Sequence, residues 1–375
     1  MTPRDETELA EAIASAKGPL RIIGGGTRDI GKPVVGETLS TSGLSGITLY
    51  EPGALTLVAQ AGTPLAEIEA ALDAENQRLA FEPMDHRTLL GTSGVPTIGG
   101  VVSGNVSGAR RIAVGACRDH MLGVRFVDGM GAVVKNGGRV MKNVTGYDLV
   151  KLLSGAYGTL GVLSEVSMKV LPKPEISATL LLHDLSLADS VTAMSAALGS
   201  PFEVTGAAQS EGKTCLRIEG FTNSVAYRTQ RLKDLLGAHG EITVLDHAAT
   251  GALWKTITDL AEFASHDAVT RVSIRPSAAP DFAKTLQQTR RADLALDWGG
   301  GLMWFGVSAA DADMHGTIQD MCTAQGGHAT LIKAPTKTRQ ILPVFQPENA
   351  TVAMLSNGLR ARFDPRGILN PGLMG

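Results

Sequence analysis

Stretches rich in glycine and hydroxyl-bearing residues carry the chemistry that this sequence shows most clearly. The first, GGGTRD at residues 24–29, follows the apolar run at residues 20–23. Consecutive backbone N–H groups without side chains, together with the Thr27 hydroxyl, can bind the oxygens of a pyrophosphate. The spacing is not G-x-G-x-x-G, and no strand-helix rhythm of a nicotinamide-binding Rossmann unit follows it. We therefore expect a pyrophosphate loop of another fold, although a lone GGGT is more often a tight structural turn.

Further stretches of this kind support the ligand interpretation. Residues 96–100 (PTIGG) and 103–108 (SGNVSG) form a second tract dense in small and hydroxylated residues. Apolar neighbours at Val95, Ile98 and Val101 favour a loop that forms a buried ligand wall over a glycine-rich surface loop. A third set follows at residues 142–149 (KNVTGYDL) and 158–163 (GTLGVL).

The elements that must position these stretches can be predicted from periodicity and caps. A helix capped at Asp5 precedes a strand at residues 20–23, and a hairpin joins residues 47–50 to 55–59. Further elements are expected as a helix from residue 63 to 72, strands at 122–127 and 131–135, a helix at 147–153, and a strand at 162–170. The run LPKP at residues 171–174 indicates a domain exit. A last helix is expected at residues 355–363.

Composition excludes several classes of protein. The chain has 375 residues, a formal net charge of −3 and 19% charged residues, which do not favour nucleic acid or a membrane surface as a partner. Its three cysteines lack metal or cluster spacing and suit a reducing cytosol. The N-terminus has no signal-peptide pattern, and the uncharged stretch at residues 88–109 is broken by glycines.

The series GGGT, TIGG, RDHMLGV, KNVTGYDL and YGTLGV resembles the FAD-binding domain shared by the vanillyl-alcohol oxidase and cell-wall reductase families. Its last blocks resemble glycolate oxidase subunits. The resemblance covers about residues 5–175 and resumes at residues 363–372 (FDPRGILNPG). It implies an α+β fold: a PCMH-type, two-subdomain FAD-binding domain at residues 1–175, an α+β cap domain at 176–340, and a C-terminal helix and return to the flavin site at 341–375.

The resemblance also implies where FAD is held. The pyrophosphate is expected on residues 24–28, the backbone near Val162 against the isoalloxazine, and Asn370 close to the flavin. The expected cofactor-binding residues are Gly24, Gly25, Gly26, Thr27, Arg28, Thr97, Gly99, Gly100, Asn105, Ser107, Gly108, Val162 and Asn370. Some members of this fold attach flavin through a histidine in the pyrophosphate loop, where this chain has Thr27-Arg28-Asp29. Noncovalent FAD and no metal are therefore expected.

Catalytic residues are less clearly marked. Oxidation of a 2-hydroxy acid needs a base for the hydroxyl proton and a cationic clamp for the carboxylate, while flavin takes the hydride. Residues of suitable type in the cap, each of which can also be core or surface, are Arg271, Arg275, Trp298, Trp304, His328 and Lys333. Related catalytic subunits carry a G-E-H-G pattern, whereas here QGGHA lacks the glutamate. His328 is the predicted catalytic residue, and the missing glutamate predicts that this chain does not oxidise glycolate efficiently alone.

The implied function is a share in the oxidation of glycolate to glyoxylate, with electrons passed onward. Because the cysteines cannot hold a cluster, we expect an iron-sulfur partner subunit and a second FAD oxidase subunit on the way to quinone. The expected location is cytoplasmic, with membrane contact only through partners. Two alternatives stay open: an autonomous FAD-dependent D-lactate dehydrogenase, and a scaffold subunit whose flavin site is empty.

Overall fold

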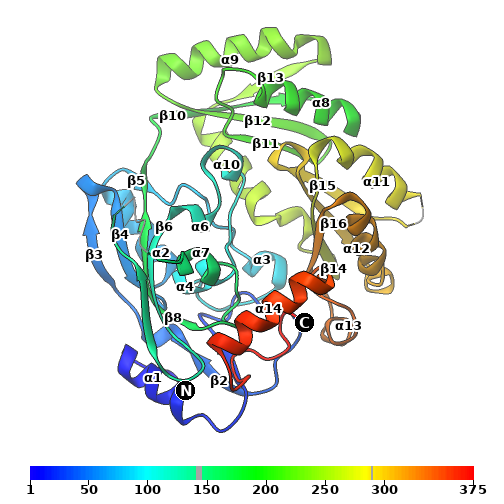
Figure 1. The fold of residues 1–375 in the computed structure, drawn as a ribbon. Helices are drawn as coiled ribbons and strands as arrows, with labels where there is room; N and C mark the ends of the chain where they lie inside the picture. Colours follow the sequence, from blue (N-terminus) through cyan, green and yellow to red (C-terminus); the bar gives the residue numbers. More distant parts are fainter. Residues whose placement is uncertain (141–145, 289) are drawn as a thin grey trace. The chain divides into compact units, whose positions relative to one another are not determined.

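The computed structural model describes residues 1–140, 146–288 and 290–375 (Figure 1). The chain divides into two compact units. Unit 1 comprises residues 1–107, 115–173 and 347–375, and unit 2 comprises residues 108–114 and 174–346. A short excursion, residues 108–114, therefore groups with unit 2 although the chain on both sides of it belongs to unit 1. Both units combine helices with largely antiparallel sheet, which confirms the predicted α+β class.

Unit 1 is built on a five-stranded antiparallel sheet in the order β3-β4-β8-β6-β7. Its strands are β3 (Ile47–Glu51), β4 (Thr56–Gln60), β6 (Met121–Val127), β7 (Val133–Gly137) and β8 (Val162–Lys169). Helices α4 (Ile98–Ser103) and α7 (Leu149–Leu153) pack on this sheet, and α2 (Leu65–Ala74) completes the layer. Their apolar residues form one core around the fully buried Ile68, Val101 and Phe126.

A smaller core in unit 1 joins the two ends of the chain. Helix α1 (Glu6–Ser15) begins where the Asp5 carboxylate accepts a hydrogen bond from the Glu8 N–H, 2.8 Å away. Strands β1 (Leu20–Ile23) and β2 (Glu37–Ser40) pair in parallel, and Leu369 from the C-terminal segment bridges to Leu20. The remaining elements of unit 1 are α3 (Arg87–Leu90), α6 (Cys117–His120), α14 (Ala350–Phe363), and the pair β5 (Gln77–Arg78) and β9 (Leu171–Pro172).

Unit 2 is built on an eight-stranded antiparallel sheet in the order β13-β10-β12-β11-β15-β16-β14-β17. Its strands are β10 (Ile176–Leu182), β11 (Gly206–Ser210), β12 (Lys213–Gly220), β13 (Ile242–Leu245), β14 (Ala268–Ser273), β15 (Asp293–Asp297), β16 (Leu302–Val307) and β17 (His328–Lys333).

Successive side chains along these strands point to opposite faces of the sheet, and helices cover both faces. Leu180 and Leu182 of β10 enter the large core, whereas Leu181 between them belongs to a separate cluster with Trp254. Helices α8 (Leu187–Leu198), α9 (Thr222–Leu236), α11 (Ala279–Gln287) and α12 (Met314–Gln325) contribute to the large core (Figure 1). Helix α10 (His247–Asp259) covers the other face, and α13 (Thr336–Ile341) follows β17.

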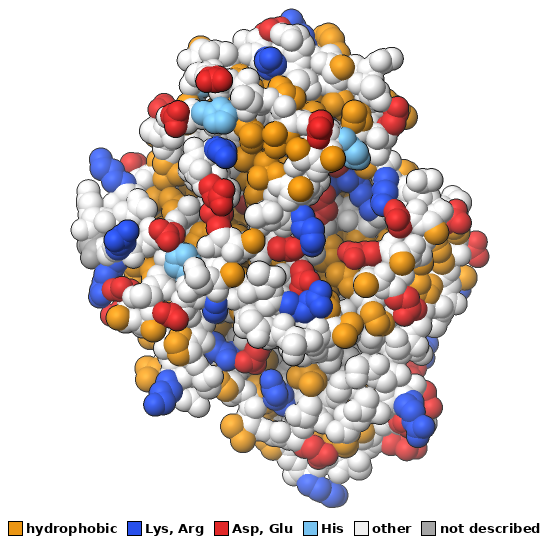
Figure 2. All heavy atoms as spheres, turned by 180° about the vertical axis from the view of Figure 1, so that it is seen from behind, with side chains coloured by type: hydrophobic (Ala, Val, Ile, Leu, Met, Phe, Trp, Pro, Cys, Tyr) orange, Lys and Arg blue, Asp and Glu red, His pale blue; other side chains and the backbone are white. Residues whose placement is uncertain are grey.

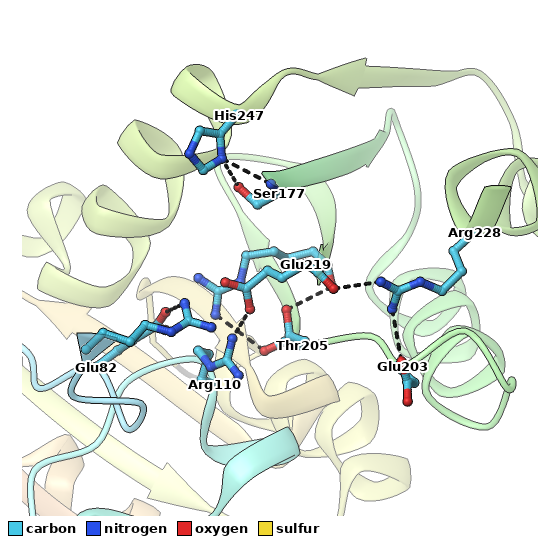
Figure 3. Close-up of polar contacts among 10 residues, drawn as sticks. Glu82, Arg110, Ser177, Glu203, Thr205, Glu219, Arg228 and His247 are labelled. Carbon is cyan, nitrogen blue, oxygen red and sulfur yellow. Dashed lines mark hydrogen bonds and ion pairs between the residues drawn. The ribbon is translucent and has the colours of Figure 1, made fainter. Parts of the chain in front are cut away.

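Buried charges attach the excursion to the sheet of unit 2, as Figure 3 shows. Arg110 forms an ion pair with Glu219 of β12, and the two side chains are only 9% and 6% exposed. A second buried cation, the Arg217 guanidinium, lies 3.8 Å from the same carboxylate and 4.6 Å from the Trp254 ring. Arg228 donates to the Glu219 carbonyl oxygen, 2.6 Å away. Residues 108–114, with α5 (Arg111–Val114), are thus held by the sheet of unit 2.

Candidate functional site

A large pocket in unit 1 is walled mainly by backbone from three parts of the chain. Its space is about 1000 Å³ including the open mouth, which is within the range of ligand pockets. Strand β1 leads directly into the first wall, α4 gives the second, and the start of β8 with the C-terminal segment gives the third. The predicted cofactor residues that the structure brings together here are Gly24, Gly25, Gly26, Thr27, Arg28, Thr97, Gly99, Gly100, Val162 and Asn370.

The second wall is a short helix, whereas the sequence predicted a loop. The Thr97 hydroxyl caps α4 by accepting from the Gly100 N–H, 3.4 Å away. Ile98, Val101 and Val102 turn into the core, so their burial stabilises a helix despite two glycines. A Cβ on Gly99 would lie 2.7 Å from the Ala61 carbonyl oxygen, so glycine lets the helix approach β4 closely.

Glycines 24 and 25 allow the first wall to contact the segment before α4. A Cβ on Gly25 would lie 1.6 Å from the carbonyl oxygen of Val95, and one on Gly24 would lie 2.4 Å from the Thr97 hydroxyl oxygen. These glycines therefore serve contact between two backbone segments of the pocket. Such contact leaves backbone on the pocket surface, which suits a ligand rich in oxygen acceptors.

Arg28 is the buried cation of this pocket, whose lining also includes Arg21 and Lys32. Burial lowers the pKa of its guanidinium to about 10. Its Nε donates to Nδ1 of the buried His86, 3.2 Å away, while its Nη2 is buried and has no hydrogen-bond partner among the residues that the structure describes. A buried cation with an unused donor fits an anion such as a pyrophosphate. The residues present therefore fit the pyrophosphate-bearing group that the sequence predicted.

Asn370 connects the C-terminal segment to the pocket. Its side-chain oxygen accepts from the Ile22 N–H and its side-chain nitrogen donates to the Tyr157 carbonyl oxygen, both at 2.8 Å. The residue is 2% exposed and has a left-handed backbone with φ of 45°. Its side chain thus fixes β1 against the segment before β8, so its first role is to shape the pocket.

Sequence reasoning overlooked several pocket residues. Tyr157 also has a left-handed backbone, and Lys32 and Leu373 lie on the lining. The YGTLGV motif quoted for the resemblance begins at Tyr157 and could have indicated it. Nothing in the sequence pattern marks Lys32 or Leu373, because their position depends on the return of the C-terminal segment.

Three predicted cofactor residues are not part of this lining. The Asn105 side chain accepts from the Arg118 N–H at 3.0 Å, and the Ser107 hydroxyl accepts from the Cys117 N–H at 2.9 Å, so both position α6. Gly108 belongs to unit 2, where its carbonyl oxygen accepts from Nε1 of Trp298 at 3.1 Å. The first part of the KNVTGYDL motif, residues 142–145, lies outside the described residues.

His328, the predicted catalytic residue, is the first residue of β17 in unit 2. Burial, followed by the charges of Arg271 and Arg111, lowers the pKa of its imidazole. Lys333, at the end of the same strand, donates to the Ala264 carbonyl oxygen at 2.8 Å. A second histidine of unit 2, His315, is structural: its ring nitrogens contact the Thr270 hydroxyl and the Pro343 carbonyl oxygen, and burial lowers its pKa to about 4.

The described part of the chain has neither a cluster of metal ligands nor a bilayer-spanning helix. No group of three or more His, Cys, Asp or Glu side chains there is placed to hold a metal ion. None of the helices of residues 1–140, 146–288 and 290–375 has the length and apolar character needed to cross a bilayer. Figure 2 shows acidic and basic side chains interspersed over the face that it draws.

Comparison with known proteins relates the chain that forms this pocket to a known family. A family model described as an FAD binding domain matches residues 1–137, the part of the chain that carries two of the pocket walls. The chain is 35% identical over 370 residues to glycolate oxidase subunit GlcE of Escherichia coli strain K12. This similarity covers 98% of the present chain and 95% of that relative.

More distant relatives match a shorter part. Glycolate oxidase subunit GlcD of Bacillus subtilis is 35% identical over 127 residues, which is 34% of this chain and 26% of GlcD. D-lactate dehydrogenase of Anaerostipes hadrus is 31% identical over 167 residues, 44% of this chain and 33% of the relative. Among solved structures, alkyldihydroxyacetonephosphate synthase has a TM-score of 0.71 at 15% identity, covering 99% of this chain and 76% of that one. That likeness shows the fold alone.

Proposed function

This chain belongs to the family of glycolate oxidase subunit GlcE, and from that premise we propose that it is the FAD-binding subunit of an enzyme that oxidises glycolate to glyoxylate. The observation that carries the proposal is the pocket of unit 1, which is lined by glycine backbone and contains one buried guanidinium, that of Arg28. The chain that forms this pocket is similar to GlcE over 98% of its length. The similarity to GlcD and to a D-lactate dehydrogenase supports a 2-hydroxy acid as the substrate class.

Each part of the pocket has a task when FAD is bound. Backbone N–H groups of residues 24–27 would hold the pyrophosphate oxygens, and Arg28 would supply the compensating charge. Gly99 and Gly100 would let the α4 backbone lie against the cofactor, and Val162 would give an apolar, buried surface. Asn370 keeps β1 and the Tyr157 segment at a fixed separation. The flavin supplies a hydride acceptor for the α-carbon of the acid.

The chain works, in this proposal, within a complex. A second oxidase subunit of the GlcD kind, expected to carry FAD, and an iron-sulfur subunit would complete the path of electrons to quinone. The three cysteines support this division of tasks, because Cys117, Cys215 and Cys322 are buried and free, and burial raises the pKa of each thiol. Buried free thiols also fit a reducing, cytoplasmic location, with the membrane reached through the partners.

An autonomous D-lactate dehydrogenase is the second candidate, and His328 favours it. The imidazole carries a lowered pKa and is therefore neutral at pH 7, as a general base must be. Against it, the QGGHA segment lacks the acidic neighbour expected of the catalytic relatives. The third candidate, a scaffold subunit, predicts an empty flavin site.

One experiment separates the three candidates. The full chain is purified, its FAD content is measured, and it is mixed without oxygen with glycolate or D-lactate while absorbance of the oxidised flavin is followed. The mixing is then repeated with the two partner subunits present. We expect bound FAD that glycolate bleaches rapidly only in the complex.

Other outcomes point elsewhere. Rapid bleaching of the isolated chain that is lost in His328→Ala would establish an autonomous dehydrogenase. A chain purified without flavin, and unable to take it up, would support the scaffold. Bleaching in a complex that is just as fast when this chain lacks FAD would contradict a flavin role for this subunit.

A further inference from the structure

Helix α14 of unit 1, red in Figure 1, has no fully buried residue among its fourteen, all of which the structure describes. Every other helix of more than four residues in the ranges 1–140, 146–288 and 290–375 has at least one. Four large apolar side chains of α14, those of Val352, Met354, Leu355 and Leu359, are between 39% and 65% exposed. Packing within the chain therefore does not account for the apolar sequence of this helix.

The exposed apolar residues of α14 form a continuous surface. Val352, Leu355 and Leu359 follow one another at spacings of three and four residues, so they lie on one side of the helix. Met354 widens this stripe, and residues 350–359 include no charged side chain. We call these four residues the α14 face. Single exposed apolar residues are ordinary on a protein surface, whereas a contiguous apolar patch marks an interaction site.

The α14 helix is formed without any partner. Asn349 caps its first turn by accepting a hydrogen bond from the Val352 N–H, 3.0 Å away. At the other end the partly buried Phe363 packs against the core of unit 1, with its ring centroid 6.1 Å from that of Phe126. The Phe363 carbonyl oxygen also accepts from the Gly129 N–H at 2.8 Å. A preformed surface of this kind loses little conformational entropy on binding.

Arg362 adds a charge to one end of the α14 face. It is exposed, and it forms no hydrogen bond or ion pair with another residue of the described ranges. Because it follows Leu359 by three residues, it lies on the same side of the helix. Residues 350–363 contain no Asp or Glu. The complementary surface is therefore an apolar groove that receives a helix and carries an anionic group at one end.

The last turn of α14 lies beside the FAD pocket of the same unit. Arg360 and Ala361 line a second, smaller pocket together with Asn370. Asn370 also belongs to the lining of the FAD pocket. The end of α14 and the flavin site thus share a neighbouring residue. A subunit docked on the α14 face would be brought to the side of unit 1 that holds the flavin.

We propose that the α14 face is the docking surface for the iron-sulfur subunit that takes electrons from the FAD of this chain. The identity of the partner rests on the proposed function. An iron-sulfur cluster held by thiolates brings negative charge to the subunit that carries it, and Arg362 complements such a charge. A lipid surface fits less well, because helices that lie on membranes carry cations along their polar face. The two cations of α14 are both in its last turn.

The first test measures the affinity of the full chain, with its FAD, for each partner subunit separately. The variants are Leu355→Glu, which keeps a good helix former, and Arg362→Gln. Their matched controls are Leu235→Glu and Arg231→Gln at exposed positions of α9. We expect affinity for the iron-sulfur subunit to fall about tenfold or more with Leu355→Glu and about threefold or more with Arg362→Gln. The controls should change it less than about twofold, and all variants should keep their FAD and melting temperature.

Thiol labelling gives a second measurement of the same surface. The three native cysteines are buried, so Leu355→Cys supplies the accessible thiol. Glu11→Cys, on the exposed side of α1, is the control. We expect saturating iron-sulfur subunit to abolish labelling at position 355 and to leave labelling at position 11 unchanged.

Several results would overturn the docking surface. One is an iron-sulfur subunit that does not bind, or that binds wild type and both α14 variants equally. Another is a GlcD-like subunit whose binding alone depends on the α14 face. Flotation with phosphatidylcholine–phosphatidylserine vesicles that Leu355→Glu abolishes would assign the face to a membrane. A dimer of the chain that Leu355→Glu converts to a monomer would assign it to a second copy.

Failure of the proposed function gives a different result. A chain purified without FAD, and unable to take it up, that still binds the iron-sulfur subunit through the α14 face overturns the flavin role and retains the docking surface. A complex that oxidises glycolate through this FAD, with unchanged assembly in both α14 variants, retains the function and overturns the docking surface.

Discussion

At the scale of single residues, Arg28 affects both the stability of the fold and the binding of the ligand. Its guanidinium is buried, its pKa is lowered to about 10, and one of its nitrogens has no hydrogen-bond partner in the described part of the chain. A cation whose folded pKa is depressed destabilises the folded state at every pH below that pKa. At pH 7 the shift corresponds to a cost of roughly 3 kcal/mol, which a bound pyrophosphate would offset.

We predict opposite effects of Arg28→Met on the empty and the loaded protein. The apoprotein should melt at a higher temperature than wild-type apoprotein, because the cost of burying the charge is removed. Affinity for FAD should fall by about tenfold or more, because the ion pair with the cofactor is lost. Thermal melts and flavin titrations check both, with the exposed Arg4→Met as control. A lower melting temperature together with unchanged FAD affinity would contradict this assignment.

Asn370 gives a second prediction at this scale. Replacement by alanine leaves the Ile22 N–H and the Tyr157 carbonyl without their partner, and places alanine at a φ of 45°. We expect Asn370→Ala to lower the free energy of unfolding by about 2–5 kcal/mol and to weaken FAD binding. Asn370→Gly keeps the left-handed backbone, so denaturant titration of both variants separates backbone strain from lost hydrogen bonds. Two stable variants with normal FAD affinity would count against a role of the Asn370 hydrogen bonds in shaping the pocket.

The glycine pattern shows what residue types can and cannot predict. Glycines at residues 24–26 indicate backbone exposed to a ligand, and the pocket does have these residues on its surface. However, the pattern does not reveal that Gly25 meets the Val95 carbonyl. That contact joins residues far apart in sequence, and a substitution at Gly25 therefore disturbs the walls as well as the ligand. Arg28 and Asn370 are for this reason better probes of binding than Gly25.

At the scale of elements, α1 is fixed to the sheet of unit 1 through one carboxylate. Glu6, in the first turn, accepts hydrogen bonds from Arg125 of β6 and, at 2.6 Å, from the Ser164 hydroxyl of β8. The hydrogen bond from Arg125 lowers the Glu6 pKa below its ordinary value of 4.5, against the opposing effect of burial. A depressed carboxylate pKa stabilises the fold above the unfolded pKa, and this contribution is lost as pH falls through the folded pKa.

We therefore predict a pH-dependent effect of Glu6→Gln. The free energy of unfolding should fall by about 1 kcal/mol at pH 7. The difference from wild type should shrink as the pH drops below 4.5 and vanish once Glu6 is protonated in the folded state. Denaturant titrations across this range measure it, with Glu11→Gln on the exposed side of α1 as control. A difference that stays constant with pH would refute the ion pair as its source.

The excursion at residues 108–114 gives a prediction for the sheet of unit 2. Glu219 lies between two buried arginines, so Glu219→Gln removes the carboxylate charge that pairs with Arg110 and lies 3.8 Å from Arg217. Removal of one partner from a buried ion pair typically costs about 3–5 kcal/mol. Glu203→Gln is the matched control, because its carboxylate pairs with Arg228 from a position that is 82% exposed, and it should change stability little. Equal stability of the two variants, measured by thermal unfolding, would show that Glu219 does not hold the excursion.

The sequence predicted a loop at one place where packing produces a helix. Residues 96–108 have the glycine content of a loop, yet residues 98–103 form α4 because the apolar side chains between the glycines are buried. Elements with ordinary periodicity were predicted well: α1, β1, the β3–β4 hairpin, β6 and β8 lie where the sequence placed them, within a few residues. The membership of residues 108–114 in unit 2 depends on an ion pair to β12, which local sequence does not show.

At the scale of the whole molecule, we predict that FAD is bound without a covalent link. The lining of the FAD pocket, as far as the structure describes it, contains no histidine or cysteine. The nearby His86 uses Nδ1 to accept a hydrogen bond from Arg28. Acid precipitation of the holoprotein should leave all flavin in the supernatant, and a known covalent flavoprotein treated in parallel is the control. Yellow colour retained by the pellet would show the prediction to be wrong.

The family resemblance predicted most of what the molecule is for, and the side chains around Trp298 in unit 2 show where such prediction ends. Arg271, Trp298, Trp304 and His328 were all visible as candidates of suitable chemistry, each with an ordinary structural explanation. Arg111 was not, because it follows the glycine-rich tract and reaches the Trp298 ring only through the excursion. Strand register brings the others to one face, and register is a property of the folded sheet.

The return of the C-terminal segment has a consequence for the order of events during synthesis. The loop at residues 24–28 is translated more than 300 residues before Asn370 and Leu373, which line the same pocket. Leu20 likewise waits for Leu369 before its bridge can form. The complete pocket can therefore form only after Asn370 and Leu373 have left the ribosome, so a chain interrupted before them is expected to lack the full site for flavin.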